Sequence, residues 1–138
     1  STVLEFKDFI GPRVLTPIFH RIVPFRDKRK SYPKAVRNNY DYLGYQVWPM
    51  SAVNEMRKLT NKVKKELPKI KCPALVIHST KDILSLQSNI SLVYDNISSE
   101  IKEKFIVHQA NHNLFINNPD QEQIFQKINS FFNQFQRN

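Results

Sequence analysis

The segment IKCPALVIHSTKD, residues 70–82, carries the clearest structural pattern in this chain. At its centre, residues 74–78 form a short, continuous apolar run, which is typical of a strand covered on both faces of a sheet. Ser79-Thr80-Lys81-Asp82 follow as a polar turn. A second run, residues 104–108, has the same character and leads into the polar turn 109–113. The pattern therefore predicts two buried strands, each followed by a polar turn.

The segments after these turns carry apolar residues at helical spacing. They predict one helix over 85–97 and a last helix over 119–135, with Phe132 and Phe135 among the residues facing inward. The second half thus has the order β-α-β-α, which predicts parallel strands joined by a right-handed crossover. Because two strands cannot form a stable sheet alone, this half is expected to be the edge of a larger sheet.

The first half is predicted to be helical and basic. Between residues 52 and 67, apolar residues repeat at helical spacing and lysines occupy the other face, with Ser51 as a candidate N-cap. Residues 24–34, which begin and nearly end with proline, predict a surface loop. An aromatic group precedes the helix and contains Tyr40, Tyr42, Tyr45 and Trp48.

Composition excludes several functional classes. The chain has 138 residues, enough for one ordinary domain, and it has no apolar run long enough for a membrane-spanning helix. With two glycines it contains no phosphate-binding loop, dinucleotide fingerprint or Gly-x-Ser-x-Gly elbow. One cysteine, Cys72, excludes a disulfide framework, and its place before a strand predicts a buried structural thiol.

The net charge is unevenly distributed along the chain. The total is +9, but residues 1–71 hold 16 basic and 6 acidic side chains, whereas residues 72–138 hold 5 and 6. Such a basic half is compatible with an anionic partner, and it is also typical of a solvated, lysine-rich helical surface. Exposed aromatic residues beside a basic groove would suit nucleic acid, but packing of an irregular segment explains the same residues, and no nucleic acid is expected.

Two residues are the candidates for chemistry. Asp82 and His112 each lie four residues beyond a predicted strand, and the carboxyl ends of parallel strands share one edge of a sheet. A carboxylate bound to one imidazole nitrogen fixes the tautomer and leaves the other nitrogen to act as a base. The alternatives remain open: Asp82 as a turn or capping residue, and His112 as an exposed loop residue. Ser79 and Ser85 are nearby hydroxyls, and Ser85 is also a candidate helix N-cap.

Residues 70–135 resemble the C-terminal end of the α/β-hydrolase fold, of the carboxylesterase and monoacylglycerol lipase type. Ile70 and Pro73 match the segment that leads into the strand before the catalytic acid. Asp82 stands at the acid position, and His112 at the histidine position, after Asn111 where glycine is commoner. Residues 40–70 resemble the late cap of those enzymes more weakly.

The resemblance implies a cap over 1–67 and the β-α-β-α part of the core over 68–138. It implies a catalytic Asp82 and His112, and a pocket for a small-molecule ester lined by Trp48, Met50, Val53 and Met56. Because the nucleophilic serine lies upstream in that family, we expect it to be absent from this chain and the chain to be inactive alone. A separate N-terminal half or a homo-oligomer would complete it. No cofactor and no metal are implied, and a cytoplasmic location is expected. The alternative is a non-catalytic, basic binding or interaction module on the same scaffold.

Overall fold

The computed structural model describes residues 4–5, 16–27 and 45–135 of the chain. The chain divides into two compact units, one made of residues 1–7 and 63–138 and the other of residues 8–62. The predicted boundary between a cap over 1–67 and a core over 68–138 remains a prediction.

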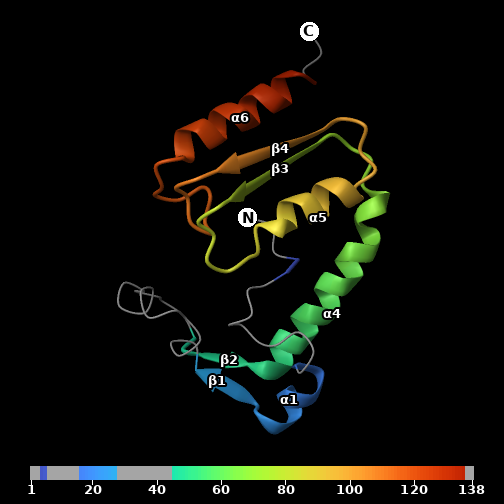
Figure 1. Ribbon diagram of the computed structural model, residues 1–138, viewed down its shortest axis with the longest axis vertical. Coiled ribbons are helices and arrows are strands. Elements are labelled where there is room, and N and C mark those ends of the chain that lie inside the picture. Colours follow the sequence, from blue (N-terminus) through green and yellow to red (C-terminus); the bar gives the residue numbers. More distant parts are fainter. Residues whose placement is uncertain (1–3, 6–15, 28–44, 136–138) are drawn as a thin grey trace. The chain divides into compact units, whose positions relative to one another are not determined.

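The larger unit contains a two-stranded parallel sheet. Strands β3 (Ala74–Ser79) and β4 (Lys102–Val107) are paired in register from Ala74 opposite Lys102 to Ser79 opposite Val107. Both arrows point the same way in Figure 1. The sequence prediction of two parallel strands is confirmed, and both strands therefore deliver their following turns to the same edge of the sheet.

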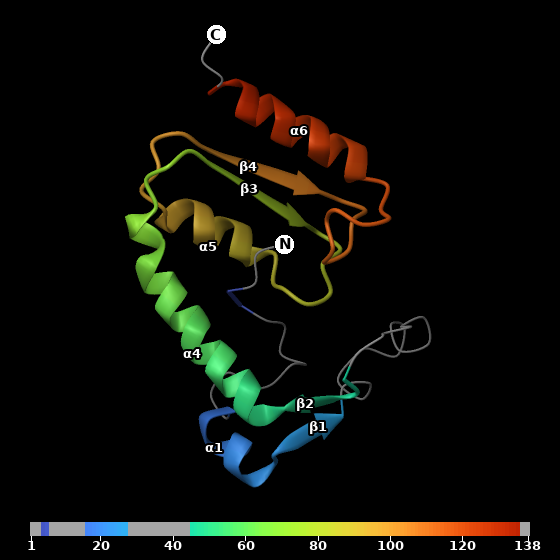
Figure 2. The same cartoon turned by 180° about the vertical axis from the view of Figure 1, so that it is seen from behind.

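Two helices cover this sheet. Helix α5 (Ser88–Asn96) connects the strands, and helix α6 (Gln121–Asn133) follows β4 on the other side of the sheet (Figures 1 and 2). One core cluster joins β4 and the segment after it to α6 through Val107, Ala110, Leu114 and Ile124. A second joins Leu4, Leu67 and Ile97. The predicted α/β class and β-α-β-α order are confirmed.

Three details differ from prediction, two in the helices and one in the segment before β3. Helix α5 begins at Ser88 instead of residue 85, because the preceding residues fold into a turn around Asp82. Phe132 is 62% exposed and Phe135 is also exposed, because the buried stripe of α6 runs through Ile124 and Phe131. Cys72 is an exposed thiol and not a buried one, since it lies in the irregular segment before β3.

The described residues of the smaller unit include helix α1 (Thr16–Ile22) and strand β1 (Phe25–Asp27), which pairs antiparallel with β2 (Val47–Pro49). The strand β1 corrects the prediction of a loop over 24–34, of which residues 28–34 lie outside the described residues.

Helix α4 (Met50–Glu66) follows β2 directly and is continued by a 3-10 turn, Leu67–Lys69. Ser51 is therefore inside the helix and not its N-cap, because the helix already begins at Met50, whose N–H donates to the carbonyl of Pro24. Of the aromatic group, Tyr45 is exposed and Trp48 half-buried, while Tyr40 and Tyr42 lie outside the described residues. None of the described helices has the length and apolar character needed to cross a membrane.

Candidate active site

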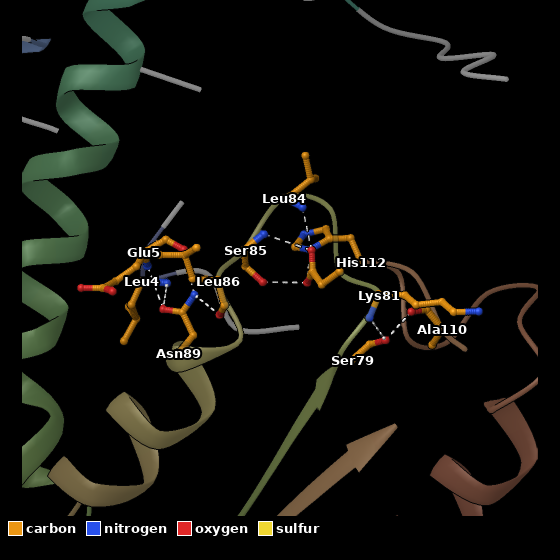
Figure 3. Close-up of polar contacts among 11 residues, drawn as sticks. Leu4, Glu5, Ser79, Lys81, Leu84, Ser85, Leu86, Asn89, Ala110 and His112 are labelled. Atoms are coloured by element: carbon orange, nitrogen blue, oxygen red, sulfur yellow. Dashed lines mark hydrogen bonds and ion pairs between the residues drawn. The ribbon is translucent and has the colours of Figure 1, made fainter. Parts of the chain in front are cut away.

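Asp82 and His112 meet at the carboxyl edge of the sheet. Asp82 lies in the turn after β3, residues 80–87, which we name the acid turn. His112 lies in the irregular segment after β4, residues 108–120, which we name the histidine turn. The Nδ1 atom of His112 is 2.9 Å from Oδ2 of Asp82, although the two residues are 30 positions apart in the sequence (Figure 3). The parallel register of the strands brings them together.

The carboxylate of Asp82 has both oxygens occupied by donors. Its Oδ1 accepts the backbone N–H groups of Leu84, at 2.8 Å, and of Ser85, at 3.0 Å. Its Oδ2 accepts the Ser85 hydroxyl, at 2.7 Å, in addition to His112. Asp82 thus forms the turn that the sequence left open as one alternative, and it also binds the histidine. Four donors are the full complement for a carboxylate.

Asp82 and His112 differ in charge and in burial, and they therefore have different roles. Burial would raise the pKa of the Asp82 carboxyl, but the hydrogen bonds from His112 and Ser85 outweigh burial and hold that pKa well below its usual range. The group is therefore ionised at neutral pH, and an ionised carboxylate only accepts, so Nδ1 of His112 carries the proton. Asp82 is 1% exposed, whereas the His112 side chain is 28% exposed. The Asp82 carboxylate is therefore shielded from solvent, whereas the His112 side chain is accessible to it.

Ser79 ties the two turns together. Its hydroxyl donates to the carbonyl of Ala110 and accepts the backbone N–H of Lys81, so it links the last residue of β3 to the segment just before His112 (Figure 3). Ser79 and Ser85 are each 1% exposed, and both hydroxyls donate within the fold. Each therefore has a structural contact that disfavours a role as nucleophile.

The acid turn is also anchored to the first residues of the chain. Asn89, which is fully buried, accepts the N–H groups of Leu4 and Glu5 and donates to the carbonyls of Glu5 and Leu86 (Figure 3). The N–H of Leu86 donates in turn to the carbonyl of Glu5. No local sequence pattern predicts this contact, because its partners are more than 80 positions apart.

The four predicted pocket residues lie in the smaller unit. Trp48 is half-buried in β2, and Met50, Val53 and Met56 succeed one another at intervals of three along α4, so they share one face of that helix. Met50 is buried, whereas Met56 is exposed. Asp82 and His112 belong to the other unit, and the part of these four residues in a pocket remains a prediction.

The other histidines do not form a recognisable centre. His78 is buried inside β3, and Nδ1 of His108 lies 3.4 Å from the hydroxyl of Thr80. Within the part of the chain that the structure describes, no three His, Cys, Asp or Glu side chains are grouped so that they could hold a metal ion.

Solved structures of lipolytic enzymes share this fold. A soluble variant of monoglyceride lipase from Saccharomyces cerevisiae superposes with a TM-score of 0.67 over 96% of this chain at 13% identity. A monoacylglycerol lipase from Paleococcus ferrophilus gives 0.63 over 95% at 19% identity. A structure reported with the metagenome-derived lipolytic enzymes LipS and LipT gives 0.60 over 67% at 29% identity. The chain spans 53%, 54% and 37% of these structures, respectively.

A search of curated protein sequences found no significant match. Residues 26–120, more than half of the chain, match the Hydrolase_4 family, described as serine aminopeptidase, S33. The match includes β3 and β4, the acid turn and the histidine turn. The chain therefore belongs to the Hydrolase_4 family and carries part of an α/β-hydrolase fold.

Proposed function

We propose that this chain supplies the acid and the histidine of a serine hydrolase that cleaves carboxylic esters. The contact between His112 Nδ1 and Asp82 Oδ2, made at the shared edge of two parallel strands, is the observation that carries the proposal. The names of the similar solved structures, which are lipolytic enzymes, support an ester as the substrate class.

In this proposal, Nε2 of His112 takes the proton of a serine hydroxyl as that oxygen attacks the ester carbonyl. The ester C–O bond then breaks, the proton passes to the leaving alcohol, and the acyl group stays on the serine. Water, whose proton His112 takes in the same way, then releases the acid and returns the proton to the serine. Asp82 keeps Nδ1 protonated and stabilises the imidazolium that forms. The sequence contains no Gly-x-Ser-x-Gly elbow, so the nucleophile and the oxyanion hole are assigned to residues outside these 138. The chain by itself is then inactive, since those groups provide the largest contributions to catalysis.

In the proposed enzyme, further strands of the sheet pack against the larger unit. In the described residues, β3 pairs with β4 alone, and an open apolar groove of about 480 Å³ runs beside it. Pro73 and Leu75 line this groove together with the exposed Phe132 of α6. Apolar surface beside an unpaired strand edge is a template for further strands. We assign the missing strands to an N-terminal half, or, failing that, to a second copy of this chain.

The substrate pocket and the cellular location of the protein are part of the same proposal. Residues 1–67 would act as a cap in which Trp48, Met50, Val53 and Met56 contact the acyl or alcohol group, as suits a mainly apolar pocket. An exposed single thiol at Cys72 is compatible with a reducing, cytoplasmic compartment.

A non-catalytic basic module is the competing function, and the lysines of the first half are what favour it. Several of them are neutralised within the fold: Lys58 pairs with Glu55 at 2.7 Å, and Lys64 pairs with Glu5 at 2.9 Å. These ion pairs engage two of the 16 basic side chains of residues 1–71 with acidic neighbours. A steep salt dependence of binding to an anionic polymer would identify this function.

The test is labelling with a fluorophosphonate, which reacts with activated serines. The chain is isolated from its source as the complex or longer polypeptide in which it occurs, labelled, and analysed by peptide mass spectrometry. We expect label on a serine outside these 138 residues. We expect His112→Ala to slow that labelling by about 10⁴-fold or more, because the serine loses its base.

His108→Ala is the matched control, since His108 is an exposed histidine at the start of the same turn. It should leave the labelling rate unchanged. Label on Ser79 or Ser85, or a His112→Ala variant that reacts at the normal rate, would contradict the proposal. If no serine is labelled in any form of the protein, the binding module becomes the better account.

A further inference from the structure

The histidine turn needs a constraint beyond its contact with Asp82. It is irregular over residues 108–120, and a single hydrogen bond from the His112 ring does not fix thirteen backbone residues. Such a segment keeps one conformation when its backbone groups have buried partners. The carboxylate of Asp120 is such a partner: its Oδ2 accepts the N–H of Gln109 at 2.6 Å and the N–H of Ala110 at 2.8 Å.

Asp120 is in an unusual situation for its position. It is the N-cap residue of α6, where an aspartate normally accepts an N–H from the first turn of its own helix, but here its side chain makes no capping hydrogen bond. The side chain is 3% exposed and reaches back across the turn instead. Its second oxygen accepts the side-chain amide of Gln123 at 2.6 Å.

The charge on Asp120 is stabilised where it lies. Burial would raise the pKa of this carboxyl, but the backbone N–H groups of Gln109 and Ala110 and the side chain of Gln123 outweigh burial and lower it. Asp120 is therefore an anion at neutral pH, and hydrogen bonds to an anion are about twice as strong as neutral ones. Asp120 therefore directs one oxygen to the side chain of Gln123 in its own helix and the other to two neighbouring backbone N–H groups of the histidine turn.

The turn is constrained on both sides of His112. On the near side, Ala110 is fully buried in the core and its carbonyl accepts from Ser79. On the far side, the side chain of Asn118 donates to the carbonyl of Leu114 at 2.8 Å and accepts the N–H of Asp120 at 3.0 Å. The segment Asn118-Pro119-Asp120 therefore joins the two ends of the turn, with His112 between them.

We propose that Asp120 is a positioning residue for His112: it fixes the backbone from which the imidazole reaches Asp82. This inference rests on the proposed function for its catalytic meaning, but the contact it describes exists without turnover. A positioning role differs from a purely stabilising one, because it predicts a change in the His112 ring itself when the Asp120 carboxylate is removed.

The test is nuclear magnetic resonance of the full chain with ¹⁵N-labelled histidine. The Nδ1 proton of His112, assigned by its loss in His112→Gln, reports the hydrogen bond to Asp82, and the ring ¹⁵N shifts report the tautomer. In Asp120→Ala we expect this proton to exchange at least ten times faster with water and the ring to populate both tautomers. The amide of Ala110 should lose its protection as well.

Glu122→Ala is the matched control, because it removes a carboxylate two residues further along from an exposed position in the first turn of the same helix. It should leave the His112 proton unchanged. A folded Asp120→Ala protein whose His112 proton and tautomer match the original would overturn the inference and leave the proposed function intact. If the unsubstituted chain already lacks the protected Nδ1 proton, the Asp82 contact itself is wrong, and the inference and the proposed function fall together.

A second pair of variants decides the matter should Asp120→Ala fail to fold. In Asp120→Asn, the remaining oxygen still accepts from Gln109 and Ala110, but the acceptor is neutral and these hydrogen bonds are weaker. In Gln123→Ala, the Asp120 carboxylate keeps both backbone contacts and loses only its contact with a side chain of α6. We expect faster exchange of the His112 proton in Asp120→Asn and unchanged exchange in Gln123→Ala. Equal exchange in the two variants would overturn the inference.

Discussion

The acid turn and the histidine turn reach the same point in the molecule by different means. In the acid turn, Asp82 binds the backbone of Leu84 and Ser85, two and three residues ahead, so the residue builds its own turn. The histidine turn is held by Asp120, ten and eleven residues from its partners Ala110 and Gln109. The acid is placed mainly by local contacts, whereas the histidine is placed by contacts across a long irregular segment.

This difference predicts where each half of the site is sensitive to change. Substitutions close to Asp82 in the sequence should disturb the acid, since its hydrogen bonds are local. Substitutions at Ser79 or Asp120 should change the position of the His112 ring, although the contacts described above for these residues are with Ala110 and not with His112.

The largest expected effect is that of Asp82→Asn on turnover in the completed enzyme. The amide cannot accept from Nδ1 while serving the same donors, so His112 adopts the wrong tautomer, and we expect kcat to fall about 10⁴-fold. The measurement is ester hydrolysis at saturating substrate. Asp95→Asn, an exposed aspartate on α5, is the control and should retain full activity. Comparable activities for the two variants would mean that the local contacts of Asp82 serve the turn alone.

Asn89→Ala should produce the largest loss of stability. It removes the side chain that binds both Leu4 and Glu5, and the buried backbone groups left behind lose their partners. We expect the free energy of unfolding to fall by about 2–3 kcal/mol and the first residues of the chain to become sensitive to protease. Urea titration and limited proteolysis measure the two effects. Asn96→Ala, an exposed asparagine on the same helix, should change neither by more than a few tenths of a kcal/mol.

Ser85→Ala should produce a smaller, pH-dependent loss. At neutral pH we expect about 1.5 kcal/mol, since the hydroxyl donates to a buried anion. The Ser85 contact lowers the pKa of Asp82, so the stability it contributes is complete above the ordinary aspartate value of about 3.9 and is lost as the pH falls toward the lowered value. The lowered pKa lies below the range of such a titration, so the gap in free energy of unfolding between the two proteins should persist from pH 7 down to about pH 3 in urea titrations. A gap that already closes near the ordinary aspartate pKa would show that the hydroxyl does not lower the pKa of Asp82. Ser91→Ala, at an exposed position on α5, is the control.

The smallest effect is expected at the surface pair of Lys104 and Asp95, which are 3.2 Å apart and partly exposed. Asp95→Ala should lower the free energy of unfolding by less than about 1 kcal/mol, because water screens such pairs. A thermal melt at low and high salt measures this. A loss as large as that of Asn89→Ala would show that the sheet is held by surface charges as much as by the buried contacts at its carboxyl edge.

Much of the fold followed from local patterns. The apolar runs before Ser79 and His108 predicted β3 and β4, and the β-α-β order predicted that they are parallel. The helix boundaries were less accurate: residues 85–87 carry a helical pattern, yet Asp82 draws them into a turn, and Phe25 belongs to a strand whose partner lies more than twenty residues away. Cys72 was expected to be buried because it stands before a strand, and Phe132 because it lies on the apolar stripe of the last helix; both are exposed, because exposure depends on which surfaces pack against them.

Local sequence patterns are enough to predict the two strands, their polar turns, and the presence of Asp82 and His112 in those turns, because the period of apolar residues and the chemistry of turns are local properties. Tertiary contacts bring the two side chains together, direct the Ser85 hydroxyl to the acid, and direct one oxygen of Asp120 to the backbone of the histidine turn. In each case the backbone permits several directions for the side chain. Contacts with buried partners distant in sequence select one of these directions, and no local pattern encodes such contacts.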